Sequence, residues 1–385
     1  MKASSRAPRA CAAESITRSR CQAATEGAAL AIDAERPTGG SQRPCCKLTT
    51  VSLERFALAP DLSICRLLNG MWQVSGAHGR IEPGAALQAM AAYVEDGFTT
   101  WDLADHYGPA EDLVGEFRRR WAGAHGQPAL APLQCFTKWV PRPGAMPRRL
   151  VEEAVATSRR RMGMETLDLL QFHWWDYADS RYLDALAHLA DLREAGHLRH
   201  LALTNFDTEH VGVILDRGVP IVSNQVQFSL VDRRPEARMA PFCRERGVHL
   251  LAYGTLCGGL LSERFLGQPE PRASALDTVS LQKYKRMVDT WGGWALFQEL
   301  LAALREVAGR HGVGIATVAV RWVLDRPAVA GAIVGTRLGL TDHRAESARV
   351  FDVKLDDEDH ARIAPVLAKS QDLLHRIGDC GDEYR

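Results

Sequence analysis

The sequence is organised around one stretch, Gly97-Phe-Thr-Thr-Trp-Asp102-Leu-Ala-Asp-His-Tyr107-Gly108, in which an apolar, β-prone run ends on a carboxylate. Two later runs have the same design, and they end on the amine of Lys138 and on the imidazole of His173. In a parallel β/α barrel the carboxyl ends of the strands meet at one mouth, where active sites lie. The pattern therefore predicts that four titratable side chains converge there: Asp102, Tyr107, Lys138 and His173.

From about Cys65 onward, β-prone runs alternate with amphipathic segments whose apolar residues have helical spacing. Eight such strands with intervening helices predict an α/β fold, a single-domain (β/α)8 TIM barrel, rather than an open doubly wound sheet. The chain also lacks the Gly-x-Gly-x-x-Gly and Gly-Lys-Ser/Thr loops of the main alternatives. The expected strands are Cys65–Trp72, Thr99–Leu103, Gln134–Lys138, Leu167–His173, His200–Thr204, Ile221–Gln225, His249–Tyr253 and Ala332–Gly335. The expected helices are Gly84–Asp96, Pro147–Met162, Tyr182–Ala195, Thr208–Arg217, Arg238–Gly247, Glu299–Gly312 and Gly314–Asp325.

The composition is that of a soluble enzyme and argues against several classes of partner. Lys+Arg and Asp+Glu are both 47, so the net charge favours neither nucleic acid nor a membrane surface. No apolar run is long enough to span a bilayer. The nine cysteines have no zinc-type spacing, so we expect reduced thiols and no metal site. We expect a small-molecule substrate, no nucleic acid and no membrane partner, and the sequence carries no signal that identifies a protein partner.

Residues 1–47 differ in composition from the rest of the chain. They begin with a stretch that is basic and rich in Ala and Ser, and that has one acid, Glu14, in its first 25 residues. Two interpretations stay open. An organellar transit segment would place the protein in the chloroplast or the mitochondrion. A disordered extension, or a start codon assigned too early, would leave it in the cytoplasm.

Two further segments do not follow the barrel pattern. Ser262–Gly293 is polar and contains Pro269 and Pro271, which predicts a long loop: either a cover over a bound ligand or a solvated insertion. Residues 367–385 follow the barrel, which we place at residues 53–366, and they form a polar C-terminal tail. We interpret this tail as a surface segment or a flap over a pocket.

The four converging side chains suit one reaction. A tyrosine with a pKa of about 10 is a weak proton donor at neutral pH, and a neighbouring lysine ammonium favours its phenolate. A carboxylate can hold that lysine, and a histidine can orient a substrate oxygen. These groups can deliver a proton to a carbonyl oxygen, but the hydride must come from a cofactor. Each residue alone has a structural explanation, as a cap, turn, surface or core residue, so the catalytic interpretation rests on their joint placement.

The chain from about Leu53 to Val366 resembles the aldo-keto reductase superfamily. Asp102-Leu-Ala-Asp-His-Tyr107-Gly is similar to its Asp-x-Ala-x-x-Tyr-Gly signature, and Leu167-Asp-Leu-Leu-Gln-Phe-His173-Trp174 is similar to its Leu-Asp-x-x-x-x-His segment. The resemblance implies a TIM barrel that binds NADPH and reduces aldehydes or ketones. It assigns Tyr107 as the general acid and makes Asp102, Lys138 and His173 its partners.

The resemblance also implies cofactor and substrate contacts. Thr204 and Asn205 in Leu-Thr-Asn-Phe, and Gln225 in Asn-Gln, are expected at the nicotinamide amide. The ring of Tyr253 is expected to stack on the nicotinamide. Trp72, which as an alternative is a core residue, and Trp174 are expected to line the substrate pocket.

The segments expected at the cofactor's phosphates depart from the family pattern. Gly254-Thr255-Leu256 replaces the usual Ser-Pro-Leu or Ser-Ala-Leu, so Leu256 keeps its place while a hydroxyl is lost. In the last strand and its loop, His343 stands where Arg or Gln is common, and Ser347 stands where Asn is. Glu346 keeps its place, and Arg337 or Arg344 is expected to supply the charge for a 2′-phosphate. NADPH is therefore the expected cofactor, with NADH possible.

Three functions remain in competition. The complete set of four residues favours an NADPH-dependent carbonyl reductase. A catalytically slow, NADPH-binding regulatory subunit that senses redox state would keep the cofactor contacts. A sugar or polyol dehydrogenase would use the same groups in the oxidative direction.

Overall fold

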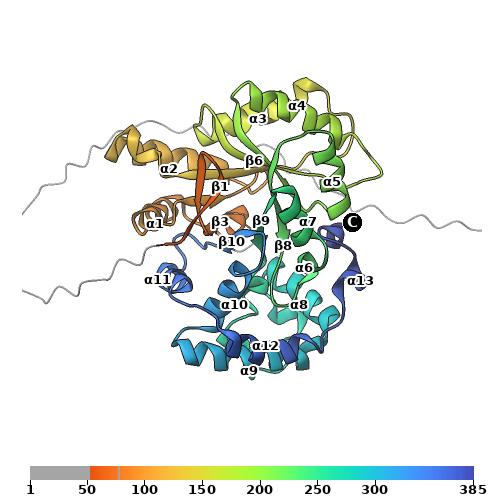
Figure 1. Cartoon of the computed structure of the whole chain (residues 1–385). Coiled ribbons are helices and arrows are strands. Elements are labelled where there is room, and N and C mark those ends of the chain that lie inside the picture. The colour runs from red at the N-terminus through yellow and green to blue at the C-terminus, as the bar shows by residue number, and fades with distance from the viewer. Residues whose placement is uncertain (1–52, 77–78) are drawn as a thin grey trace, which may run out of the picture. The chain divides into compact units, whose positions relative to one another are not determined.

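Eight parallel strands close into a barrel in the order β10-β3-β4-β5-β6-β7-β8-β9, with helices around it (Figure 1). The protein is seen here in a computed structural model that describes residues 53–76 and 79–385. The strands are β3 (Leu67–Gly70), β4 (Thr100–Asp102), β5 (Gln134–Trp139), β6 (Leu167–His173), β7 (Leu198–Thr204), β8 (Ile221–Gln227), β9 (His249–Tyr253) and β10 (Val329–Gly335). The predicted TIM barrel is confirmed. The predicted extension 1–47 lies outside the described residues.

The strands are rich in apolar residues because the barrel core covers one face and the helices cover the other. Every residue of β5 and β6 is buried, as expected for parallel strands between an inner core and an outer layer of helices. The helices are α1 (Pro83–Glu95), α2 (Ala110–His125), α3 (Arg148–Met162), α4 (Tyr182–Glu194), α5 (Thr208–Asp216), α6 (Arg234–Ala237), α7 (Met239–Arg246), α8 (Val279–Trp291), α9 (Gly293–His311), α10 (Ile315–Leu324), α11 (Arg344–Ala348), α12 (Asp357–Leu367) and α13 (Leu373–Ile377).

An antiparallel hairpin that the sequence analysis did not predict closes one end of the barrel. It consists of β1 (Arg55–Ala59) and β2 (Leu62–Cys65), directly before β3. Its Leu62 and Ile64 are buried against barrel residues such as Phe136. Arg55 also donates to Gln134 at the start of β5. The hairpin therefore covers the amino ends of the strands and leaves the opposite end for the site.

The prediction of one long loop over Ser262–Gly293 is wrong for its second half. Helix α8 begins after Thr278, whose hydroxyl caps it by accepting from the Leu281 amide at 3.1 Å. One face of α8 is buried, including Tyr284, Val288 and Trp291. Such spacing is helical, and the polar residues between these positions concealed it. Only the part before α8 runs as short turns.

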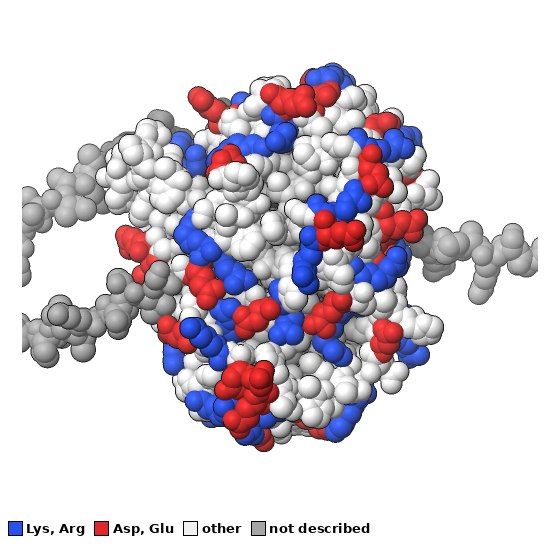
Figure 2. All heavy atoms as spheres, in the orientation of Figure 1, with Lys and Arg blue, Asp and Glu red and all other residues white. Residues whose placement is uncertain are grey.

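The surface carries charge of both signs. Basic and acidic side chains are interspersed over the face that Figure 2 shows. No helix in the described ranges has the length and apolar character to cross a membrane.

Candidate active site

A buried ion pair connects the ends of β4 and β5. Lys138 Nζ donates to Asp102 Oδ2 at 2.6 Å and to the Leu103 carbonyl at 2.9 Å. The two side chains are 3% and 4% exposed. Strands β4 and β5 are neighbours in the barrel, with Asp102 opposite Phe136, so Lys138 lies just beyond the Asp102 level. The predicted pairing of this acid with this amine is present in the structure.

Two glutamines complete the surroundings of the carboxylate. Gln171 Nε2 from β6 and Gln225 Nε2 from β8 each donate to Asp102 Oδ1 at 2.8 Å. Gln225 Nε2 also reaches Gln171 Oε1 at 2.7 Å. Gln225 was expected at a nicotinamide amide, but its own amide nitrogen is directed toward Asp102. This network fixes the carboxylate, because each of its oxygens accepts a hydrogen bond from a buried donor.

Tyr107 lies in the loop after β4, beside this pair. Its ring centroid is 5.1 Å from Lys138 Nζ and 4.9 Å from the Trp72 ring, which packs edge-on against it. Burial raises the pKa of Tyr107 well above its ordinary value, and the Asp102 carboxylate raises it further. The expected effect of the Lys138 ammonium on the Tyr107 phenolate stays a prediction.

His173 at the end of β6 is buried and neutral. Burial lowers its pKa to about 3, and the positive charges of Arg385, His106 and Lys138 act in the same direction. Its Nε2 has no hydrogen-bond partner within the described ranges. The ring lies 4.2 Å from that of Trp175. A neutral imidazole with an unpartnered nitrogen can bind a substrate oxygen.

The low pKa of His173 predicts that the free energy of unfolding decreases as the pH is lowered. The unfolded chain takes up a proton at this histidine below about pH 6.5, and the folded chain does so only near pH 3. Because the unfolded state then binds more protons, the free energy of unfolding should fall by about 1.4 kcal/mol per pH unit between about pH 6 and pH 4. Urea unfolding of His173→Gln should lack this contribution. If the free energy of unfolding decreased equally with falling pH in the unchanged protein and in His173→Gln, the low pKa would not belong to His173.

Thr204, Asn205 and Tyr253 gather where β7 and β9 end. The Thr204 hydroxyl is buried and has no partner among the described residues. Asn205 adopts a left-handed backbone with φ 57°, and its Oδ1 accepts from the Tyr253 hydroxyl at 2.9 Å. An unpartnered hydroxyl can bind the amide of a nicotinamide, and an aromatic ring can pack on its face.

The structure brings one predicted pocket tryptophan to the mouth and not the other. Trp72 packs against Tyr107. Trp174 is fully buried, and its indole nitrogen donates to the carbonyls of Asp176 and Asp179 at 2.6 and 2.9 Å. Its neighbour Trp175 is 38% exposed and lies against His173, so Trp175 is the tryptophan from this segment that faces the mouth.

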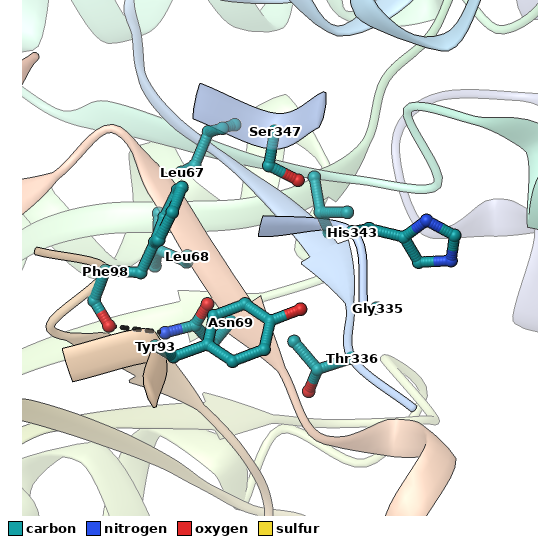
Figure 3. Close-up of a pocket in the computed structure, with 10 residues that line it drawn as sticks. Leu67, Leu68, Asn69, Tyr93, Phe98, Gly335, Thr336, His343 and Ser347 are labelled. Carbon is teal, nitrogen blue, oxygen red and sulfur yellow. Dashed lines mark hydrogen bonds between the residues drawn. The ribbon is translucent and has the colours of Figure 1, made fainter. Parts of the chain in front are cut away.

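Two of the residues expected at the adenosine phosphate line a small cavity beside β3 and β10. Ser347 and His343 line it together with Thr336 and Tyr93, and Figure 3 shows the His343 imidazole directed away from the other labelled side chains. Glu346 lies 3.7 Å from His343 Nδ1 and raises the pKa of His343.

Two more of the expected phosphate-site residues do not line this cavity. Arg337 is exposed in the loop after β10. Leu256 is half-buried in the turn after β9, where its carbonyl accepts from the Gly259 amide at 2.9 Å.

Arg344 does not present its charge to this cavity. Its guanidinium donates to the carboxylates of Asp342 and Asp96 and to the Ala92 carbonyl. These contacts tie α11 to α1. Of the two arginines expected at a 2′-phosphate, Arg344 is therefore committed to structural contacts.

Comparison with known proteins decides the family. The model of the Aldo/keto reductase family matches residues 66–368. This chain belongs to the aldo/keto reductase family. Aldo-keto reductase YhdN of Bacillus subtilis is 27% identical over 279 residues, covering 70% of this chain and 80% of that protein.

Two other comparisons extend the likeness. Flagellar radial spoke protein 5 of Chlamydomonas reinhardtii is 29% identical over 260 residues, and the match spans 58% of this chain and about half, 49%, of that protein. The structure of the glycerol dehydrogenase AKR11B4 from Gluconobacter oxydans has a TM-score of 0.67 at 21% identity, covering 86% of this chain and 98% of that one. At this identity the likeness shows a shared fold.

Sequence reasoning did not single out several residues at the mouth of this aldo/keto reductase. Gln171 lies two positions before His173 on the same strand. Because side chains of a strand alternate between its two faces, the sequence alone could have placed both residues on one face. Lys283 on α8 had no local signal, and for the C-terminal tail a flap over a pocket was only one of the two interpretations. Their neighbours at the mouth come from distant parts of the sequence.

Proposed function

We propose that this aldo/keto reductase is an NAD(P)H-dependent carbonyl reductase that converts aldehydes or ketones to alcohols, with Tyr107 as the general acid. The observation that carries the proposal is the buried Lys138–Asp102 pair beside the Tyr107 ring. The unpartnered nitrogen of His173 adds a group for the substrate oxygen at the same mouth. Such a set matches proton delivery to a carbonyl.

Each residue has a defined part in this chemistry. A bound reduced nicotinamide supplies the hydride, which no side chain can supply. The phenol of Tyr107, whose ordinary pKa of about 10 already keeps it protonated at neutral pH, is the proposed proton donor to the carbonyl oxygen. Lys138 lies close enough to the ring to stabilise the phenolate that remains. The neutral His173 orients the carbonyl oxygen, and Asp102 holds Lys138 in place.

We further propose that NADPH is preferred over NADH. The support is the positive charge near the cavity beside β10: Arg337 is exposed there, and Glu346 raises the pKa of His343. Ser347 adds a hydroxyl. These groups can bind a 2′-phosphate without Arg344.

The test is oxidation of reduced cofactor by the full-length chain with a panel of aldehydes and ketones. We expect turnover in the ordinary enzyme range of about 1–10³ s⁻¹ for a good substrate, and a lower Kd for NADPH than for NADH. Tight NADPH binding without turnover on any carbonyl would instead support the regulatory subunit. Oxidation of sugars or polyols that is faster than any reduction would support the dehydrogenase.

A further inference from the structure

The last residues of the chain pack against the mouth of the barrel. Asp379 accepts from the Thr208 amide at the start of α5 at 3.0 Å, and the chain end lies beside α5 and α7 in Figure 1. Arg385 donates to the Asn205 carbonyl at 2.7 Å and to the Trp174 carbonyl at 3.2 Å. Its guanidinium lies 3.9 Å from the Tyr177 ring centroid. The segment is therefore held to the ends of β6 and β7.

A buried charge cluster anchors this segment. Arg234 Nη2 donates to Asp232 Oδ2 and to Glu383 Oε2, each at 2.8 Å. The three side chains are 1%, 1% and 5% exposed. Removing one partner of an ion pair that is buried this deeply is strongly destabilising. Glu383 therefore stabilises the position of the segment against the ends of β6 and β7.

Tyr384 occupies space between the proposed catalytic and nicotinamide residues. Its hydroxyl is 3.2 Å from the Tyr253 hydroxyl and accepts from Lys283 Nζ. Its ring centroid lies 6.3 Å from that of His173 and 5.7 Å from that of Trp175. The phenol thus spans the mouth from the end of β6 to the end of β9.

The proposed nicotinamide contacts are already engaged. Asn205 offers its Oδ1 to Tyr253 and its carbonyl to Arg385. The Tyr253 hydroxyl lies 3.2 Å from Glu383 Oε1, and Lys283 Nζ is 5.2 Å from the Tyr253 ring centroid. A nicotinamide that used Asn205 and Tyr253 would have to take these positions from residues 383–385 and from Lys283.

We propose that residues 381–385 are an autoinhibitory plug that fills the nicotinamide end of the site, so that the cofactor binds only when the segment has left. The inference rests on the proposed function, because it takes Asn205 and Tyr253 as the nicotinamide contacts. Apparent affinity for the cofactor is then the intrinsic affinity reduced by the open fraction of the protein. Removing the plug raises that fraction toward one.

Gly381 offers a way to displace the plug with a single substitution. A Cβ at this position would lie 2.0 Å from the Asn205 carbonyl oxygen, and its φ of +89° disfavours any other residue. Gly381→Val should therefore push the segment off the mouth. A truncation after Cys380 is the second variant, and it keeps Asp379 and the buried Cys380 in place. Arg376→Ala, at an exposed position on α13, is the matched control.

The experiment is a titration of NADPH into the full chain and these variants, followed by protein fluorescence. We expect the Kd of the truncated chain and of Gly381→Val to be about tenfold or more below that of the full chain, and that of Arg376→Ala to be unchanged. We also expect amide hydrogen exchange over residues 379–385 of the full chain to increase when NADPH is saturating.

Three outcomes would overturn the proposal. Equal or weaker NADPH binding by the truncated chain and by Gly381→Val would mean that the segment helps to form the site. Greater protection of residues 379–385 in the presence of NADPH would mean the same. If neither the full chain nor a variant bound NADPH or NADH, the proposed function would fail, and the plug proposal would fail with it. If only the plug proposal were wrong, the full chain would still bind the cofactor.

Discussion

Tyr107→Phe is expected to reduce kcat for carbonyl reduction by about 10²–10⁴-fold, the usual contribution of a positioned general acid. The variant keeps the ring, and therefore the contacts with Trp72 and with the Lys138 ammonium. It removes only the hydroxyl that we propose as the proton donor. The Kd for NADPH should stay within a factor of about two, since the hydroxyl is not among the proposed cofactor contacts. Steady-state kinetics with the best carbonyl of the panel and an NADPH titration measure the two quantities.

A matched control removes a phenol hydroxyl elsewhere. Tyr182 on α4 is also buried, and its ring packs against Trp174 and Phe206 on the helix side of the barrel. Tyr182→Phe should leave kcat unchanged. If Tyr107→Phe retained turnover within tenfold of the unchanged protein, Tyr107 would not be the general acid.

The barrel could be predicted because parallel buried strands leave a clear sequence pattern. The run Leu167–His173 was expected as a strand and is one with the same bounds. Its residues before His173 are apolar or hydrogen-bonded, since both faces are covered. The polar group at its end then falls at the mouth by topology alone. The juxtaposition of Asp102, Lys138 and His173 follows from the same rule.

The hairpin and helix α8 were missed although both carried local signals. Pro60-Asp61 separates two short β-prone runs and is typical of a turn. In α8, Leu281, Tyr284, Val288 and Trp291 have helical spacing, but Pro269 and Pro271 upstream favoured a loop for the whole stretch.

The contacts of the proposed plug could not be predicted from the sequence, although a flap over a pocket was one of the two interpretations of the tail. Glu383 meets Arg234 across 149 positions, and Lys283 meets Tyr384 across 101, so only the closed barrel brings them together. The sign of the Tyr107 pKa shift likewise depends on surroundings that the fold assembles. Burial and the Asp102 carboxylate raise this pKa, and only the structure shows both around the phenol.

Lys138→Met is expected to lower the free energy of unfolding by about 3–5 kcal/mol, the usual cost of removing one partner of a buried ion pair. Asp102 would keep its bonds to Gln171 and Gln225 and lose its only cationic contact seen among the described residues. Turnover should fall as well, because the phenolate of Tyr107 would lose the ammonium beside it. Urea unfolding at neutral pH measures the first effect, and steady-state kinetics measure the second.

A second substitution separates the two consequences. In Lys138→Met/Asp102→Asn the buried charge is removed together with its partner, and the asparagine oxygen can still accept from the glutamines. This double variant should recover more than half of the lost stability but none of the lost turnover. Lys369→Met, which breaks an exposed ion pair with Glu299, is the control and should change stability by less than about 1 kcal/mol. A double variant no more stable than Lys138→Met would mean that the loss comes from packing of the lysine stem, and that Asp102 does not require a cation to be buried.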